Sequence, residues 1–121
     1  MLVTVGLDMR KTVTNIMHLA YKDGKADEAY YAGRLQEHLM LGRYYALGFT
    51  KSGSKEGEER VRVELGPEID KPLAELEKLT TNKERIELLN KLKALRATYM
   101  ESFGIMAQYI YLKMDLVENT L

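Results

Sequence analysis

The C-terminal third of the chain carries a helical pattern that is too apolar for a small protein to bury alone. From Thr81 to about Glu118, apolar residues return every three or four positions, and Thr81-x-x-Glu84 matches the capping box that begins many helices. The segment from Phe103 to Leu112 is apolar on more than one face, whereas a helix buried on one side has a polar back. The pattern predicts one long helix that packs against copies of itself or a larger assembly.

The rest of the composition describes a small globular protein without an obvious ligand. A chain of 121 residues forms one domain with a modest core, here residues 1–121. Eighteen basic and eighteen acidic residues cancel, so any binding to nucleic acid must come from a local patch. The chain has no cysteine, which excludes disulfides and thiolate chemistry. No apolar run is long enough for a membrane span, and the abundance of Glu, Lys and Arg suggests a cytoplasmic protein from a thermophile.

Helical and alternating patterns divide the chain into five elements. Helices are predicted over residues 9–22, with Asp8 as the N-cap and Gly24 as the stop, and over residues 26–46, 70–79 and 82–118. Between residues 46 and 65 the period changes to two, and a polar loop rich in glycine and serine lies in the middle, which is typical of a β-hairpin. The expected fold is therefore mainly α: a small helical bundle with an inserted β-hairpin and a long C-terminal helix.

A few residues interrupt the apolar stripes of the predicted helices. Gly33 and Gly42 are poor helix formers, and their small size would permit the close approach of a neighbouring helix. Arg85 and Arg96 fall on the buried stripe of the last helix, where their alkyl stems can cover apolar surface. These positions are expected to serve packing.

Basic residues form two strips that can contact a nucleic-acid backbone. On the predicted hairpin, Arg60 and Arg62 share one side, and the tip adds further lysines, although neighbouring glutamates weaken the local field. Tyrosine is also frequent, and tyrosines beside arginines either stack on bases or line a protein interface. The candidate nucleic-acid contacts are Lys51, Lys55, Arg60 and Arg62 on the hairpin, and Lys91, Lys93 and Arg96 on the last helix.

A catalytic alternative depends on Arg34 and His38. Four residues apart on one helix face, they can supply a phosphate ligand and a general base. The pair resembles that of a family of helical ribonucleases, although only three residues intervene here, fewer than in that family. The sequence has no phosphate-binding loop, nucleophile elbow or zinc-protease motif, and no ligand set for a metal. No cofactor is therefore expected, and the non-catalytic interpretation is preferred.

The order of elements resembles one family of assembly proteins. Short helices, a small β insertion and a long C-terminal helix look like the small subunit of archaeal type I-A CRISPR interference complexes, which act in antiviral defence. The resemblance implies an accessory subunit that contacts other protein subunits and a single-stranded RNA or DNA backbone. Self-association as a homo-oligomeric helical module is the third alternative. In each case the predicted interface residues are Phe103, Met106, Ile110 and Leu112.

Overall fold

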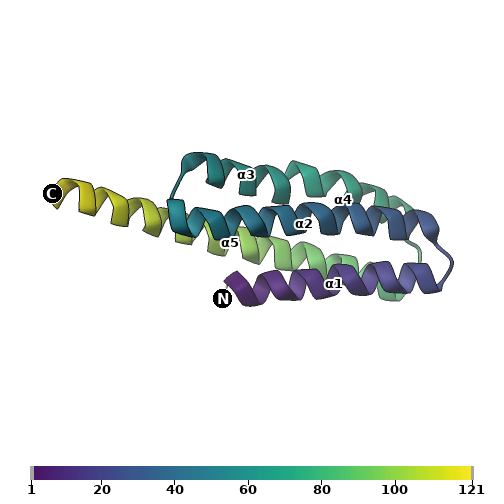
Figure 1. Cartoon of the computed structure of the whole chain (residues 1–121). Coiled ribbons are helices and arrows are strands. Elements are labelled where there is room, and N and C mark those ends of the chain that lie inside the picture. Colours follow the sequence, from purple (N-terminus) through teal and green to yellow (C-terminus); the bar gives the residue numbers. More distant parts are fainter. Residues whose placement is uncertain (1, 121) are drawn as a thin grey trace.

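In a computed structural model, the chain is a bundle of antiparallel helices (Figure 1). The structure describes residues 2–120, with side chains as far as Glu118, and this part contains five helices and no strand. They are α1 (Leu2–Lys22), α2 (Ala26–Ser52), α3 (Lys55–Leu65), α4 (Pro67–Leu79) and α5 (Lys83–Thr120). Helices α3 and α4 follow one another along α2, so that four columns of helix run alternately in opposite directions. The prediction of a mainly α fold is confirmed.

The predicted β-hairpin is wrong, because residues 46–65 are helical except for a short turn. Helix α2 continues to Ser52, and Gly53 ends it with a left-handed φ of 62°. Ser54 then caps α3, its hydroxyl accepting a hydrogen bond from the Gly57 amide at 3.0 Å. The spacing from Val61 to Leu65 is compatible with both periods, and burial of these two residues follows the helical one.

Three predicted helix starts also differ from the structure, and the first of these is that of α4, which begins at Pro67 instead of residue 70. Helix α1 begins at Leu2 instead of residue 9, so Asp8 lies inside the helix, and its carbonyl accepts a hydrogen bond from the Thr12 hydroxyl at 2.7 Å. For α5, the N-terminal cap is Asn82, whose side-chain oxygen accepts a hydrogen bond from the Arg85 amide at 3.1 Å. Thr81 and Glu84 therefore do not form the predicted capping box. Asn82 is an equally strong capping residue, one position later.

A single apolar core runs along the bundle axis, and every helix contributes to it. Its largest fully buried side chains include Phe49 and Phe103, whose ring centroids lie 5.5 Å apart. The stripe that starts at Val61 continues past the α3–α4 break through buried Ile69 and Leu76. Residues predicted to be strand and residues predicted to be helix therefore form one continuous apolar face against α2.

Gly42 permits the close approach of α2 and α3. A Cβ atom added at Gly42 would overlap the buried side chain of Leu65. At Gly33 the nearest atom to such a Cβ would be the Met17 sulfur at 3.9 Å, which is ordinary contact. The expectation of a close helix approach thus holds for Gly42.

We expect Gly42→Ala to lower the free energy of unfolding by about 1–3 kcal/mol, because the core must shift to admit a methyl group. The matched control is Gly48→Ala in the same helix, where no atom lies within 4 Å of the added Cβ. That variant should be stabilised by up to ~1 kcal/mol through helix propensity. Urea unfolding of both variants measures the difference. Stabilisation by both substitutions would contradict the close packing.

A buried ion-pair network joins the two helical connections at one end of the bundle. The Arg85 guanidinium donates to Glu28 Oε1 from Nε at 2.9 Å and to Asp23 through Nη1. The Thr80 hydroxyl donates to the same Glu28 oxygen at 3.2 Å. Arg85, Glu28 and Thr80 are buried, and Asp23 is half exposed. Arg85 was expected to cover the stripe with its stem, whereas its charged end is the central feature of this network.

Candidate functional site

The last third of α5 extends beyond the other helices (Figure 1), and apolar side chains on the C-terminal half of this helix are exposed. Up to Ala107 the helix contributes buried residues to the core. Ile105, Tyr109 and Leu112 are 63%, 64% and 59% exposed, and Met114 is partly exposed as well. Exposed apolar residues gathered on one helical segment are typical of a surface that binds another molecule.

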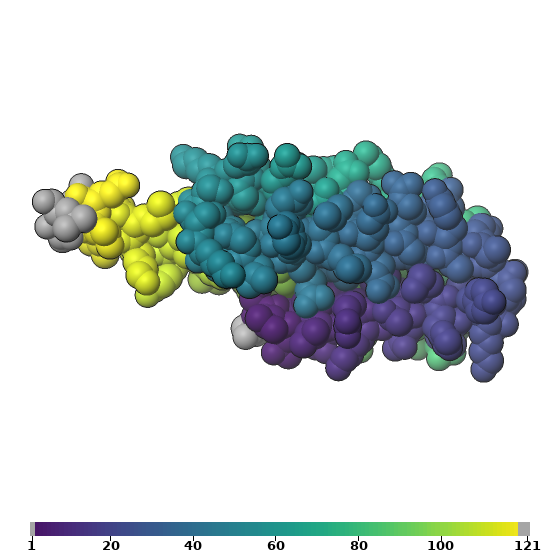
Figure 2. Space-filling model, viewed as in Figure 1, coloured from purple at the N-terminus to yellow at the C-terminus, as the bar shows by residue number. Residues whose placement is uncertain are grey.

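A groove beside the projecting segment enlarges this apolar surface. Helix α1 begins level with Tyr99 of α5, and these elements with the end of α2 line a cavity of about 250 Å³ that includes Leu2, Val3 and Leu47. A second cavity of about 270 Å³, between the end of α2 and Tyr109, shares Thr50 with the first. Figure 2 shows that α1 starts short of the α2 end, while the yellow part of α5 extends farther than both. The two cavities, together called the groove, therefore lie next to each other between the first turn of α1 and Met114 of α5.

The predicted interface residues divide between core and surface. Phe103 is fully buried in the chain's own core, with its ring centroid 5.5 Å from that of Phe49, so another chain cannot reach it. Met106 and Ile110 are partly buried against the same core. Leu112 alone of the four is exposed. The outward face adds Ile105 and Tyr109, which the sequence showed as part of a helix apolar on several sides but did not assign to the surface.

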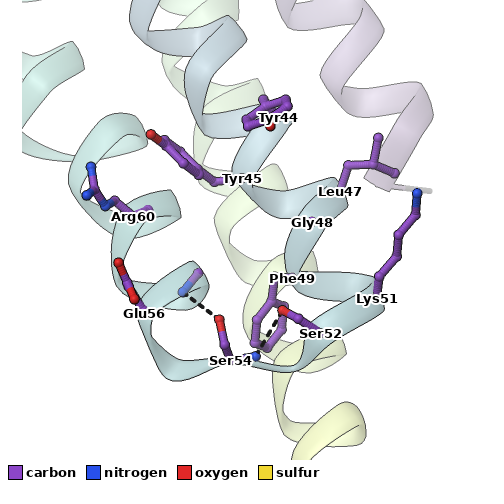
Figure 3. Close-up of a pocket in the computed structure, with 11 residues that line it drawn as sticks. Tyr44, Tyr45, Leu47, Gly48, Phe49, Lys51, Ser52, Ser54, Glu56 and Arg60 are labelled. Atoms are coloured by element: carbon purple, nitrogen blue, oxygen red, sulfur yellow. Dashed lines mark hydrogen bonds between the residues drawn. The ribbon is translucent and has the colours of Figure 1, made fainter.

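A second concave surface lies where α2 meets α3, and it holds aromatic and basic side chains (Figure 3). The cavity has a volume of about 440 Å³ and is lined by Tyr44, Tyr45, Lys51 and Arg60 among others. The guanidinium carbon of Arg60 lies 5.5 Å from the centroid of the Tyr45 ring, within the range of a cation–π contact. Tyr44 is largely exposed, so its ring is available for stacking.

The candidate basic residues of the first strip lie on different sides of α3. Lys51 and Arg60 line the α2–α3 cavity, and Lys55 lies beside it at the first position of α3. Arg62 lies elsewhere, over the Phe103 ring, and forms an ion pair with Glu58 at 2.9 Å. Arg60 and Arg62 were expected to share one strand face. In a helix, residues two apart point about 200° apart, so they separate.

The second strip is largely neutralised by neighbouring acidic residues. Lys93 pairs with Glu77 at 3.0 Å, and Arg96 pairs with Asp70 at 2.6 Å. Arg96 also donates to the Leu65 carbonyl at 3.4 Å, close to the break between α3 and α4. Lys91 is exposed and forms no ion pair with any residue whose side chain the structure describes. Arg96 is thus placed to stabilise the bundle.

Arg34 and His38 do not converge on a common point. The His38 Nδ1 atom lies 2.7 Å from Glu64 Oε2, and Nε2 lies 4.0 Å from Glu68. Arg34 is exposed, 3.7 Å from Glu37, and donates to the Tyr30 hydroxyl at 3.3 Å. His38 therefore links α2 to both α3 and α4. The sequence did not reveal Glu64 and Glu68 as its partners, because the predicted hairpin placed Glu64 on a strand.

A charged cluster fixes the position where α5 leaves the bundle. The Tyr111 hydroxyl donates to Glu58 Oε1 at 2.7 Å, and Arg62 Nε lies 3.0 Å from the other oxygen. The hydrogen bond from Tyr111 is the main cause that lowers the pKa of Glu58, and Arg62 adds to it. Burial and the bond to Glu58 raise the pKa of Tyr111 to about 12.

We expect Tyr111→Phe to raise the pKa of Glu58 and to lower the free energy of unfolding by about 1–2 kcal/mol at pH 7. Because the pKa of Glu58 is lower in the folded protein than in the unfolded chain, ionised Glu58 stabilises the fold at pH values above its unfolded pKa. This stabilisation is lost as the pH falls through the folded pKa. For Tyr111, whose pKa is raised, the protonated hydroxyl stabilises the fold below pH 10. This stabilisation is lost as the pH rises from about 10 to about 12. NMR titration of Glu58 and urea unfolding at pH 7 measure both effects. An unchanged Glu58 pKa would contradict the assignment.

The described residues contain no arrangement typical of a metal centre or of a membrane span. Nowhere among residues 2–118 do three acidic or histidine side chains gather around a point where an ion can bind. Over residues 2–120, no helix is both long and apolar enough to cross a bilayer. Comparisons with protein families, with curated proteins and with solved structures find no match to this chain. The apolar face of α5 and the α2–α3 cavity are the two candidate binding surfaces.

Proposed function

We propose that the protein is a non-catalytic subunit of a multiprotein assembly and that the projecting face of α5 docks a neighbouring protein chain. The observation that carries this proposal is the exposure of Ile105 on the last buried turns of α5 and of Tyr109 and Leu112 just beyond them. Burying one such side chain fully contributes about 1.5–3 kcal/mol, so a partner gains considerable free energy by covering three. The contacts of both His38 nitrogens with carboxylates support a structural role over a catalytic one.

The kind of assembly is part of the same proposal. Of the features that resemble CRISPR small subunits, the short helices and the long C-terminal helix are present, and the β insertion is absent. A small subunit of this kind needs two surfaces, one for its protein neighbours and one for a single-stranded backbone. The α5 face and the α2–α3 cavity are separate surfaces suited to these two roles.

The docking proposal can be tested by affinity purification of tagged full-length protein from its source cells. We expect wild type to retain protein partners that Ile105→Lys/Leu112→Lys loses, because two buried charges oppose docking. The control Tyr21→Lys/Ile86→Lys changes two exposed apolar residues away from the projecting segment and should keep the partners. Quantitative mass spectrometry of all three samples measures the effect. Equal recovery with the α5 double variant would reject docking through this face.

Contact with nucleic acid is the second part of the proposal, and the α2–α3 cavity favours it over the other basic residues. Lys51 and Arg60 supply positive charge, and the exposed Tyr44 ring supplies a stacking surface (Figure 3). A base that stacks on an aromatic ring contributes about 1–3 kcal/mol. Lys93 and Arg96 already pair with acidic residues, so they have less to gain from a phosphate.

Binding of a labelled single-stranded oligonucleotide at several salt concentrations tests this part. Lys51→Glu/Arg60→Glu should weaken binding. It should also reduce the slope of the logarithm of the binding constant against the logarithm of the salt concentration, by the amount that corresponds to about two phosphate contacts. Tyr44→Ala should weaken binding without changing the slope. The control Lys93→Glu, far from the cavity and already neutralised, should bind as wild type does. If all variants bind equally, nucleic acid does not use this cavity.

A further inference from the structure

The exposed stripe of α5 has a spacing that reads the same in both directions. Ile105, Tyr109, Leu112 and Leu116 are separated by four, three and four residues. This spacing is that of the seam by which two helices interlock in a coiled coil. When two copies of the stripe lie antiparallel about a two-fold axis between Ile110 and Tyr111, Ile105 of one copy faces Leu116 of the other, and Tyr109 faces Leu112. The stripe is therefore complementary to itself.

The direction of the groove also fits a second copy of α5. Helix α1 runs antiparallel to α5 (Figure 1), and the groove extends from the first turn of α1 toward Met114 of α5. A two-fold axis perpendicular to α5 brings the second α5 into the same antiparallel direction. From Tyr99 to its end, α5 offers about 20 residues, or roughly 30 Å, along which that helix can lie.

The charges at the helix ends are complementary in this arrangement. The last turn of α5 has no basic residue, and Asp115 and Glu118 precede its end, where the helix dipole is already negative. The first turn of α1 has no acidic residue, and Arg43 lines the cavity beside it without an ion pair to any described side chain. The two-fold axis sets Glu118 of one copy level with Phe103 of the other, about one turn beyond the Tyr99 level of that cavity. The acidic end of each copy thus approaches the positive end of the other.

We propose that the chain docked on the α5 face is a second copy of this protein. The projecting segments of the two copies pack against each other in antiparallel directions. This inference rests on the proposed function and names the partner. Each copy supplies both the projecting helix and the groove, so the assembly closes as a dimer with two-fold symmetry. Val3 and Leu47, at the edge of the groove, are placed to contact the incoming helix.

Sedimentation equilibrium of the purified full-length protein tests the inference. We expect wild type to be a reversible dimer, and Ile105→Lys/Leu112→Lys to raise the dimer dissociation constant at least about 100-fold, since each charge occurs twice in a symmetric interface. The control Tyr21→Lys/Ile86→Lys should dimerise as wild type does. Asp115→Lys/Glu118→Lys should weaken the dimer while making the helix itself more stable, because lysine suits a helix C-terminus. Circular dichroism confirms that each variant folds.

Two results would overturn the inference. One is a monomer at all concentrations up to about 100 µM, and the other is a dimer that the α5 variants leave unchanged. A monomeric pure protein that nevertheless loses partners in cells through Ile105→Lys/Leu112→Lys would reject the second copy alone. The proposed docking role would then stand with a different protein as the partner. If the pure protein is monomeric and Ile105→Lys/Leu112→Lys also keeps all its partners in cells, both proposals are rejected.

Discussion

Replacement of Arg85 by alanine is expected to lower the free energy of unfolding by about 3–5 kcal/mol. The substitution leaves the Glu28 carboxylate buried without its main partner, and the Thr80 hydroxyl alone cannot compensate for the lost charge. Asp23 is half exposed, so water can solvate it. The loss is comparable to much of the stability of a small domain, and urea unfolding monitored by circular dichroism measures it.

Two further variants separate the buried charge from the loss of packing. Arg85→Met/Glu28→Leu removes both charges and should recover most of the stability, because apolar residues of similar volume often replace a buried ion pair without loss. Lys93→Ala breaks the half-exposed pair with Glu77 and should cost at most about 1 kcal/mol. A loss from Arg85→Ala no larger than that from Lys93→Ala would show that the network contributes little.

The second large effect concerns the register of the proposed dimer. The natural chain has no cysteine, so single-cysteine variants can report one contact each. When Ile105→Cys and Leu116→Cys chains are mixed and oxidised, we expect a cross-link between the two different chains in most of the mixed dimer. These two positions face one another in the antiparallel arrangement, within the reach of a disulfide.

Each single-cysteine variant alone is the control for that experiment. Two Ile105 positions lie about 11 residues apart along the antiparallel pair, roughly 16 Å, which is too far for a disulfide. Ile105→Cys alone should therefore remain largely uncross-linked, as measured by non-reducing electrophoresis. Efficient cross-linking of Ile105→Cys with itself would indicate a parallel pair and contradict the proposed arrangement.

The long helices could be predicted from the sequence, and the short helix α3 could not. In α5 the apolar period repeats over many turns, so the helix was recognised together with its apolar end. In α3 only Val61, Val63 and Leu65 carried the signal, and three alternating residues fit a strand as well as a helix. The deciding signal was Ser54, which caps α3 and was interpreted as part of a hairpin loop.

The candidate site was predictable where it depends on local pattern and unpredictable where it depends on distant partners. The apolar character of Phe103–Leu112 is local, yet the assignment of Phe103 to the core and Leu112 to the surface requires the position of α2. The pairing of Arg96 with Asp70 joins residues that are distant in the sequence, as does that of His38 with Glu64. A charge counted as free in the sequence is therefore often neutralised once the chain folds.

A helical segment that leaves its core has little to stabilise it except a partner. Residues beyond Ala107 extend a helix that is already formed, so nucleation is not required, but most of their side chains gain no burial within one chain. Amide hydrogens in such a segment exchange rapidly with solvent unless another surface covers it. The projecting part of α5 should therefore be protected in the assembly and unprotected in the free monomer.

Hydrogen exchange of the α5 peptides that cover residues 105–118 tests the docking of this face most directly. At protein concentrations at which the assembly forms, we expect slow exchange across this segment in wild type. In Ile105→Lys/Leu112→Lys the same segment should exchange fast, while protection around Leu92 in the core stays unchanged. Dilution of wild type should produce the same loss of protection if the partner is a second copy. Equally fast exchange in purified wild type and variant would reject a second copy as the partner, and equally fast exchange in assemblies purified from source cells would contradict docking through this face.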